Sequence, residues 1–442
     1  MATIRLDTTL ADLYRANGIE GPFIVTMYCV FGHMDLHPEF PRELVYPEDE
    51  EPVPYANDEK EIAHLRRVIL GLKPLRRAFG LGDMEVIFFE PNITAKGMER
   101  ALAQMVPEQR HRPTIVNLDQ GDVLEQLRQV TMGRKLLFWR PQGWMNEHDC
   151  LIDPGEAYDI NSKKFLLTSG MHTPPSEIVD LQETDMVGRE SIFRTRPLPF
   201  VIKLYRAGCS FGTYLVTNEE RRKQALEAMS KYKSRGVSEV LLSKYIDLVQ
   251  DLSVHFLVGA PDSDHDRHNP LILGVTVQTL TKEGKWVGGH IDYSAQEALQ
   301  SLVWDTVRDT TAKMPATFMG WAGVDIVVDK AGEQFVVDLN ARFTGSMPIC
   351  FMSGHFWKDR GLPLAQFAAF EYKGGVDDIY ERLQPLIERG QVVVTATATV
   401  GEDLNMADVV WGGKDQGDLA QVEGWVRKRM ARSWIEVMAT GE

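Results

Sequence analysis

The residues best suited to chemistry lie in segment 323–340, which is predicted to form a β-hairpin. Apolar residues alternate along both of its strands, at Val324, Ile326, Val328, Phe335, Val337 and Leu339. The opposite face therefore holds Asp325, Asp338 and Asn340, because successive side chains of a strand point to opposite faces. A turn centred on Ala331 and Gly332 places Val328 opposite Phe335, and the same register places Asp325 opposite Asp338.

This register predicts a cation site. Directly opposed Cβ atoms lie roughly 4.5–5.5 Å apart, and like charges at that spacing repel each other. Two carboxylates and one amide oxygen are ligands that suit Mg²⁺, or Mn²⁺ in its place, because such an ion keeps further positions for water and phosphate oxygens. The alternative is a hairpin whose acidic face only meets water.

A second candidate is Lys203, which comes near the end of the apolar segment 200–204. A loop of small residues follows, with Ser210, Gly212 and Thr213. Backbone N–H groups of such a loop can approach phosphate oxygens closely, and a lysine neutralises them as a point charge. The alternative is an ordinary glycine-containing hairpin turn. Lys163 alone is typical of a solvated charge after a turn.

The first third of the chain supplies elements of an α/β layer. Short apolar runs at 23–30, 85–89, 114–118 and 135–139 predict strands, and the spacing of apolar residues in 94–105 and 122–130 predicts helices. Strands that alternate with helices favour a parallel sheet.

The remainder of the chain predicts the elements that position the two candidates. Strands are expected at 200–204, 240–246, 252–258, 271–280 and 392–400, with helices at 161–172, 219–233, 298–307 and 419–430. We therefore predict three domains: an N-terminal α/β domain over 1–160, a central domain over 161–250 and a C-terminal domain over 251–442.

Composition excludes several functional classes. The chain has 442 residues, 44% hydrophobic content and a formal net charge of −15, so a surface that concentrates nucleic acid or anionic lipid is not expected. Its four cysteines are too widely spaced to predict a zinc site or a disulfide framework, which favours the cytoplasm. Neither a signal peptide nor a membrane-spanning segment is predicted.

The order of these features resembles the ATP-grasp superfamily over about residues 160–350. The most specific part is Asp338-Leu339-Asn340-Ala341-Arg342, which is similar to the acidic-x-Asn-x-Arg element of that superfamily. An acidic residue, Asp325, precedes it on the neighbouring strand. The resemblance implies an ATP-grasp fold of the α+β class. An N-terminal α/β domain with a parallel sheet would precede it in the chain.

The resemblance also implies roles for individual residues. Lys163 and Lys203 would hold the phosphates of ATP, and Ser210, Gly212 and Thr213 would lie in the loop that closes over them. Lys244, Tyr245 and Ile246 would contact the adenine, and Asp251 would contact the ribose. Asp325, Asp338 and Asn340 would bind Mg²⁺, and Arg342 would stabilise the acyl phosphate.

The chain departs from the family pattern at Ser243, where many relatives have glutamate, and at Asp338, where glutamate is commoner. The expected activity is an ATP-dependent ligation of a small-molecule carboxylate to an amine through an acyl phosphate, with Arg342 and Lys203 as catalytic residues. The alternatives are a carboxylase, a phosphotransferase or a nucleotide-binding regulatory module, and a homodimer stays open.

Overall fold

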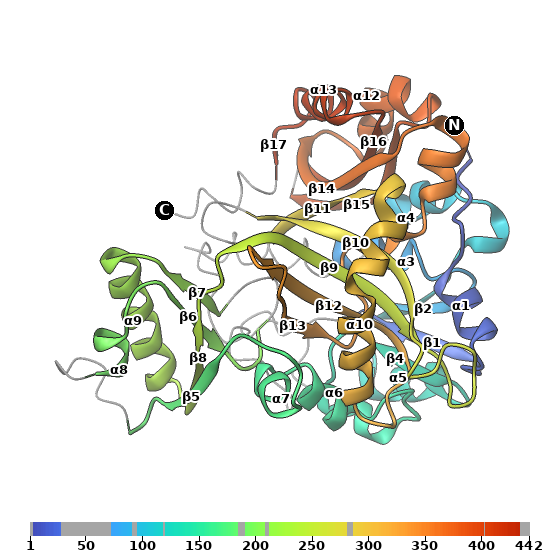
Figure 1. Ribbon diagram of the computed structural model, residues 1–442. Coiled ribbons are helices and arrows are strands. Elements are labelled where there is room, and N and C mark those ends of the chain that lie inside the picture. The colour runs from blue at the N-terminus through green and yellow to red at the C-terminus, as the bar shows by residue number, and fades with distance from the viewer. Residues whose placement is uncertain are drawn as a thin grey trace.

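The computed structural model describes residues 3–27, 72–90, 95–117, 120–183, 191–207, 212–280, 286–401 and 403–433. Their strands form three sheets, which are arranged side by side in Figure 1. Part of the predicted strand 23–30 and the predicted phosphate-loop residue Ser210 lie outside these ranges.

The N-terminal sheet is parallel, as predicted, with the order β3-β2-β1-β4. Apolar strands and amphipathic helices alternate along this part of the chain, which is the pattern of a layered α/β unit. Its strands are β1 (Phe23–Thr26), β2 (Glu85–Glu90), β3 (Arg112–Asn117) and β4 (Lys135–Phe138). Its helices are α1 (Leu10–Ala16), α3 (Lys73–Ala78), α4 (Ala95–Ala103) and α5 (Val123–Thr131), with short helices at Pro107–Gln109 and Gly143–Glu147.

The second sheet is small and antiparallel, with the order β5-β8-β6-β7. Together with α8 and α9 it forms the green part at the left of Figure 1. Its strands are β5 (Ser176–Asp180), β6 (Phe200–Leu204), β7 (Thr213–Val216) and β8 (Glu239–Lys244). The helices of this region are α6 (Pro154–Ile160), α7 (Lys163–Thr168), α8 (Ile192–Thr195) and α9 (Glu219–Ser234). Helix α7 is shorter than the predicted 161–172. Ser162 caps its N-terminus, and its last residue, Thr168, lies well before Pro174.

The third sheet is the largest, with the order β13-β12-β9-β10-β11-β14-β16-β15 and with β17 paired to β14. Its strands are β9 (Leu248–Val258), β10 (Leu271–Leu280), β11 (Trp286–Asp292), β12 (Gly320–Asp329), β13 (Gln334–Asn340), β14 (Leu364–Lys373), β15 (Val392–Gly401), β16 (Leu404–Gly413) and β17 (Arg432–Ser433). The helices are α10 (Gln296–Lys313), α11 (Met347–Cys350), α12 (Val376–Glu388) and α13 (Gln416–Arg427), with short helices at Tyr293–Ala295 and Gly354–Lys358. The proposed domain boundaries at residues 160 and 250 stay a prediction.

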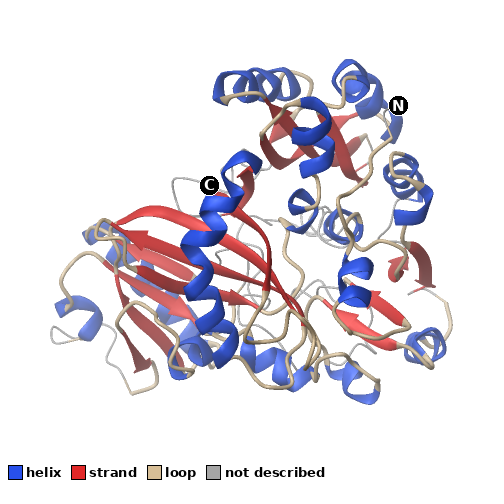
Figure 2. Ribbon diagram, turned by 45° about the vertical axis from the view of Figure 1, so that its right-hand side comes forward, coloured by secondary structure: helices blue, strands red, loops and turns tan. Residues whose placement is uncertain are grey.

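Helix α10 determines which face of the large sheet is available for chemistry. Its Val303 and Val307 pack on the apolar face of β9 and β12, which includes Val254 and Val324. Figure 2 shows this helix lying along the sheet. The alternate residues of β9 and β12 therefore point away from α10.

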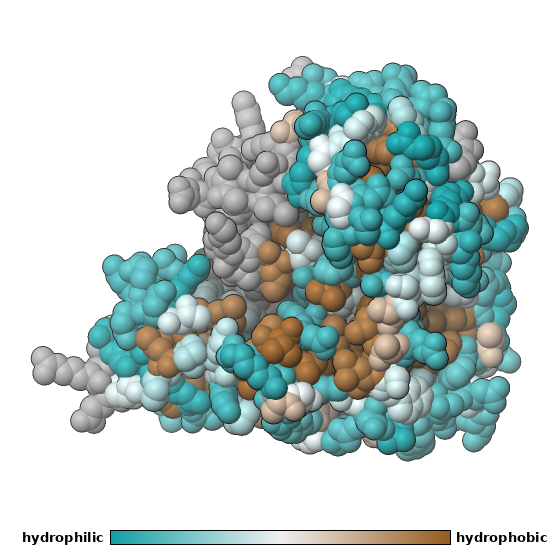
Figure 3. All heavy atoms as spheres, turned by 45° about the horizontal axis from the view of Figure 1, so that its top comes forward, coloured by the Kyte–Doolittle hydropathy of each residue, from teal (hydrophilic) through white to brown (hydrophobic). Residues whose placement is uncertain are grey.

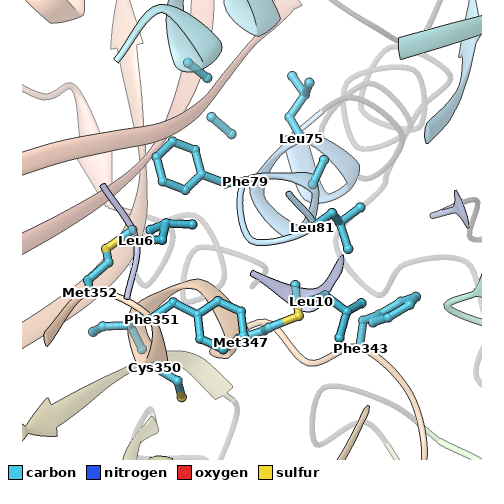
Figure 4. Close-up of a cluster of buried hydrophobic side chains, with 14 of the residues drawn as sticks. Leu6, Leu10, Leu75, Phe79, Leu81, Phe343, Met347, Cys350, Phe351 and Met352 are labelled. Atoms are coloured by element: carbon cyan, nitrogen blue, oxygen red, sulfur yellow. The ribbon is translucent and has the colours of Figure 1, made fainter. Parts of the chain in front are cut away.

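Apolar packing holds the N-terminal unit against the large sheet. Leu75 and Phe79 of α3 belong to the same buried cluster as Phe343 and Met347, which follow β13 (Figure 4). On the face shown in Figure 3, hydrophobic residues gather in a band between polar surfaces. No helix in the described part of the chain is long and apolar enough to cross a membrane.

Candidate active site

An acidic face lies where β9, β12 and β13 run side by side. Asp325 is directly opposite Asp338 on β13, as predicted, and is opposite Ser253 on β9. Asp251 lies two residues before Ser253 and shares this face. Three carboxylates therefore line one patch of the sheet.

The predicted register is wrong nearer the turn. Val328 pairs with Gln334 instead of Phe335, and Ile326 pairs with Val336. The two registers meet at a β-bulge that leaves Val337 without a partner on β12. The turn is therefore one residue shorter than predicted. Within it, the Asp329 carboxylate accepts hydrogen bonds from the backbone N–H groups of Ala331 and Glu333.

Two lysines from outside the large sheet reach the acidic face. The Lys203 ammonium, on β6, donates to the carbonyl of Val337 at 2.9 Å. The Lys163 ammonium, at the start of α7, lies 3.2 Å from Oδ1 of Asp338 and donates to the carbonyl of Ala207 at 3.4 Å. The Lys163 side chain is 7% exposed, so its charge interacts with Asp338 largely out of water.

The charges of this site shift one another's pKa values. Burial, reinforced by the neighbouring Lys163, lowers the pKa of Lys203 to about 8, although the aspartates oppose this shift. Burial, reinforced by Asp338 and Asp251, raises the pKa of Asp325 to about 7. Burial also raises the pKa of Asp251, against the effect of Lys203. Perturbed groups concentrated in one place are typical of functional sites.

The donor set fits Mg²⁺ bound together with a phosphorylated ligand. Asp325 and Asp338 supply carboxylate oxygens, and Asn340 lies two residues beyond Asp338 on the same face of β13. Oδ1 of Asp325 is oriented by the hydroxyl of Ser253, which donates to it at 2.7 Å. Within the described ranges, no three His, Cys, Asp or Glu side chains are grouped to hold a metal ion by themselves. Mg²⁺ meets this condition, because it commonly uses one or two carboxylates and completes its shell with phosphate oxygens and water.

The predicted nucleotide residues lie around the small sheet. Gly212 has a positive φ of 67°, and Thr213 begins β7 directly opposite Lys203. This conformation favours glycine, and a Cβ at Gly212 would also lie 2.8 Å from the Leu204 side chain, which would have to move. Lys244 ends β8, and Tyr245 and Ile246 connect it to β9 of the large sheet.

Arg342 follows this face and forms no ion pair with any residue that the structure describes. Its backbone N–H donates to the Asn340 carbonyl at 2.8 Å, which turns the chain at the end of β13. Its Nε is buried without a hydrogen-bond partner, and no acidic group in the described ranges forms an ion pair with it. Its guanidinium lies 5.7 Å from the centre of the Trp139 ring.

Sequence reasoning missed a buried chain of hydrogen bonds beneath this turn. The Thr276 hydroxyl donates to the Ser253 carbonyl at 3.2 Å, so it must accept from Nε2 of His255, 3.2 Å away. Nδ1 of His255 is then an acceptor, and the Thr344 hydroxyl donates to it at 3.1 Å. Burial lowers the pKa of His255 to about 3, which keeps the ring neutral as this pattern requires.

Gly323 makes the contact between His255 and Thr344 sterically accessible. It lies opposite both His255 and Asn340, and a Cβ there would come within 3.0 Å of the Thr344 methyl group and 3.3 Å of Nδ1. The polar chain thus connects β9 and β10 to the segment that carries Arg342. No local pattern marks it, because its members meet only through strand pairing.

Comparisons with known proteins agree with the predicted family. Residues 176–340 match a family model described as "L-aspartate--L-methionine ligase, ATP grasp". No curated protein matches the chain significantly by sequence.

Solved structures share the fold at low sequence identity. A carboxyaminoimidazole ribonucleotide synthase from Aspergillus clavatus, complexed with ATP, is 12% identical with a TM-score of 0.52, over 84% of this chain and 98% of that chain. An N5-carboxyaminoimidazole ribonucleotide synthetase complexed with ADP is also 12% identical, with a TM-score of 0.50, over 80% and 94%. These two structures show that the chain shares their fold. The family match covers residues 176–340, the segment that includes the acidic face. The chain therefore has the fold of these structures, and its residues 176–340 are similar to a family of ATP-grasp ligases.

Proposed function

We propose that this ligase joins the carboxylate of one amino acid to the amino group of another through an acyl phosphate, with release of ADP and phosphate. The observation that carries the proposal is the placement of Lys163 and Lys203 beside the opposed pair Asp325 and Asp338. Cations from one side and paired carboxylates from the other suit a magnesium-bound triphosphate. Amino acids are the substrates because the matching family model is described by L-aspartate and L-methionine.

In the first step, a carboxylate oxygen of the donor attacks the γ-phosphorus of ATP, and the bond from that phosphorus to the oxygen of ADP breaks. Lys203 and Lys163 hold the phosphates and balance the charge that passes to ADP. At pH 7 Lys203 is still protonated, because its pKa of about 8 lies above that pH.

Asp325, Asp338 and Asn340 would hold Mg²⁺, which supplies charge neutralisation of the phosphate oxygens when it is bound. Ser253 fixes the orientation of Asp325 towards this position. Like charges opposed across a strand pair repel each other, so a bound cation would stabilise this arrangement.

In the second step, the amine attacks the acyl carbon, phosphate leaves, and the amine loses a proton to give the amide. Arg342 holds the acyl phosphate, since its planar guanidinium can bind a carboxylate or a phosphate through two parallel hydrogen bonds. Its unpartnered Nε leaves donor capacity for such a ligand. Lys244, Tyr245 and Ile246 receive the adenine, Asp251 the ribose, and Ser210, Gly212 and Thr213 cover the phosphates.

The test is a product assay with ATP, Mg²⁺, L-aspartate and L-methionine, followed by the same assay with mixtures of amino acids. We expect a condensed dipeptide by mass spectrometry and one ADP for each dipeptide. Release of AMP would contradict the acyl phosphate. ATP turnover that requires bicarbonate and no amino acid would identify a carboxylase instead.

A pair of lysine variants separates the site from a general charge effect. Lys203→Met removes the ammonium beside Val337 and should lower turnover by at least about 10², the order seen for loss of one preorganised electrostatic donor. Lys330→Met is the matched control, because Lys330 is 72% exposed and pairs with the equally exposed Asp247. It should leave turnover unchanged.

A further inference from the structure

One carboxylate of the acidic face has a positive partner within the protein itself. The Lys163 ammonium lies 3.2 Å from Oδ1 of Asp338, and the two side chains are 7% and 26% exposed. An ion pair that is partly shielded from water is stronger than one at the surface. Asp338 is also one of the two carboxylates that would bind Mg²⁺, so Lys163 and the metal ion need the same negative charge.

Contacts with both sheets fix the position of Lys163. Its backbone N–H donates to the carbonyl of Tyr205 at 2.8 Å, just after β6, and its ammonium donates to the carbonyl of Ala207 at 3.4 Å. Two residues earlier, Oδ1 of Asn161 accepts a hydrogen bond from the backbone N–H of Ala341 at 3.0 Å, just after β13. Helix α7 itself lies beside β13 (Figure 1). The ammonium is therefore held at the junction of the small and the large sheet.

The other lysine of the site makes a different contact. Lys203 donates to the backbone carbonyl of Val337 at 2.9 Å, and its charge acts on Asp325 and Asp338 through space. Lys163, in contrast, contacts a carboxylate oxygen directly. Loss of the Lys163 charge would therefore free that oxygen most directly.

The Lys163 ammonium also has a part in the proposed reaction, where it holds the phosphates of ATP. One positive charge cannot fully neutralise both a triphosphate and Asp338. When the phosphates draw this charge to themselves, Asp338 loses its internal cation and becomes a better ligand for Mg²⁺. The same phosphates bring further oxygen ligands, which Mg²⁺ needs in addition to one or two carboxylates.

We propose that Lys163 is an internal counter-ion that competes with Mg²⁺ for Asp338, so that the metal ion binds with the nucleotide or after it. This inference rests on the proposed function and adds to it the order in which the site is assembled. It assigns opposite effects to one side chain, because Lys163 favours binding of the nucleotide and opposes binding of the metal ion alone.

The test measures binding of the metal ion without nucleotide. Mn²⁺ prefers the same oxygen ligands as Mg²⁺, and the free ion is counted by electron paramagnetic resonance while Mn²⁺ is titrated into the full chain. Lys163→Met removes the charge, and Lys163→Gln removes it while keeping a donor for the carbonyl of Ala207. We expect both variants to bind Mn²⁺ at least about tenfold more tightly than the wild type, because Asp338 is no longer neutralised.

The same variants should affect the nucleotide in the opposite direction. Calorimetry with ATP in the presence of EDTA should show at least about tenfold weaker binding, because the charge that meets the phosphates is gone. Asp338→Asn should instead bind ATP more tightly than the wild type under these conditions, because Lys163 no longer has to leave an anionic partner. A general loss of structure would weaken binding of both ligands.

Lys164→Met is the matched control. Lys164 is the next residue of α7, is 45% exposed, and lies 2.6 Å from Oε2 of Glu239, away from the acidic face. Its substitution removes one positive charge from the same helix and should change neither the Mn²⁺ affinity nor the ATP affinity. Lys163→Arg keeps the charge at the site and should bind Mn²⁺ as weakly as the wild type.

The outcomes separate this inference from the proposed function. Unchanged Mn²⁺ affinity in Lys163→Gln, or weaker ATP binding in Asp338→Asn, would overturn the competition even if the wild type condenses amino acids. Equal tightening of Mn²⁺ binding in Lys164→Met would also overturn it, because the effect would then come from net charge. Tighter Mn²⁺ binding in the two neutral Lys163 variants alone, without condensation of any amino acids by the wild type, would support the competition and overturn the proposed reaction.

Discussion

Thr344→Val is expected to impair the chemical step without impairing ATP binding. The substitution keeps the shape of the side chain and removes the hydroxyl that donates to Nδ1 of His255 at 3.1 Å. His255 is fully buried, and the direction of its hydrogen bonds leaves Nδ1 as an acceptor. The variant therefore buries an acceptor with no donor, beside the segment that carries Arg342.

The magnitude follows from the cost of that acceptor. A buried polar group that loses its partner costs about 1–3 kcal/mol. If segment 341–346 shifts to relieve this cost, Arg342 leaves its position against the acyl phosphate. Since about 1.4 kcal/mol corresponds to a factor of ten, kcat should fall by about 5- to 150-fold.

The assay measures kcat and the KM for ATP in three variants. Thr344→Ser keeps the hydroxyl and loses only the methyl group near Gly323, so it should retain most of the activity. Thr306→Val removes a hydroxyl that donates to Gln334 at 2.7 Å on the opposite side of the sheet, so it controls for general destabilisation. It should leave kcat unchanged.

The reasoning is refuted by either of two results. One is a kcat for Thr344→Val within a factor of two of the wild-type value. The other is a loss of activity in Thr344→Ser as large as that in Thr344→Val, because the hydroxyl would then not be the group that matters.

Three further predictions concern the charged groups. Asp338→Asn should lower kcat by at least about 10² at saturating Mg²⁺, because it removes one metal ligand. The melting temperature then reports the balance between relieved repulsion with Asp325 and the lost ion pair with the buried Lys163. The protonated ammonium of Lys203 is the form that binds phosphate, and it loses its proton as the pH rises through about 8. Calorimetry should therefore show that ATP affinity falls above pH 8, by up to tenfold per pH unit. Lys203→Arg should abolish this pH dependence, because arginine stays charged. Arg76→Met should destabilise the protein by about 3–5 kcal/mol in urea unfolding, because Asp408 is left buried and unpaired, and Asp408→Asn in the same chain should recover part of the loss.

The sequence was sufficient for elements with a clear local pattern. Alternation in β12 and β13 predicted the hairpin and its acidic face, because the other face of each strand is buried against α10. The opposed pair Asp325 and Asp338 was predicted from a register that is wrong near the turn, and the bulge at Val337 restores that pairing. The bulge at Val337 was not predictable. Val337 continues the apolar alternation, and only the contact of its carbonyl with Lys203, 134 residues earlier, distinguishes it.

Other parts of the fold lack such a pattern. Strand β14 is buried on both faces, so its residues are apolar at nearly every position and do not alternate. Helix α12 contains Pro385, which masks its helical signal. The contacts of the Trp139 ring with Arg77 and Arg342 bring together residues from α3, from the end of β4 and from the segment after β13. Nothing local to any of these segments indicates the other two.

The bulge at Val337 has a consequence for which changes the chain can tolerate. Lys203 binds the backbone carbonyl at this position, so the link between the small and the large sheet does not depend on the identity of residue 337. Other apolar side chains can therefore stand there without altering the link. Deletion of one residue is different, because it would merge the two registers into one and turn that carbonyl back into the ladder. Position 337 therefore tolerates other apolar residues better than it tolerates the loss of a residue.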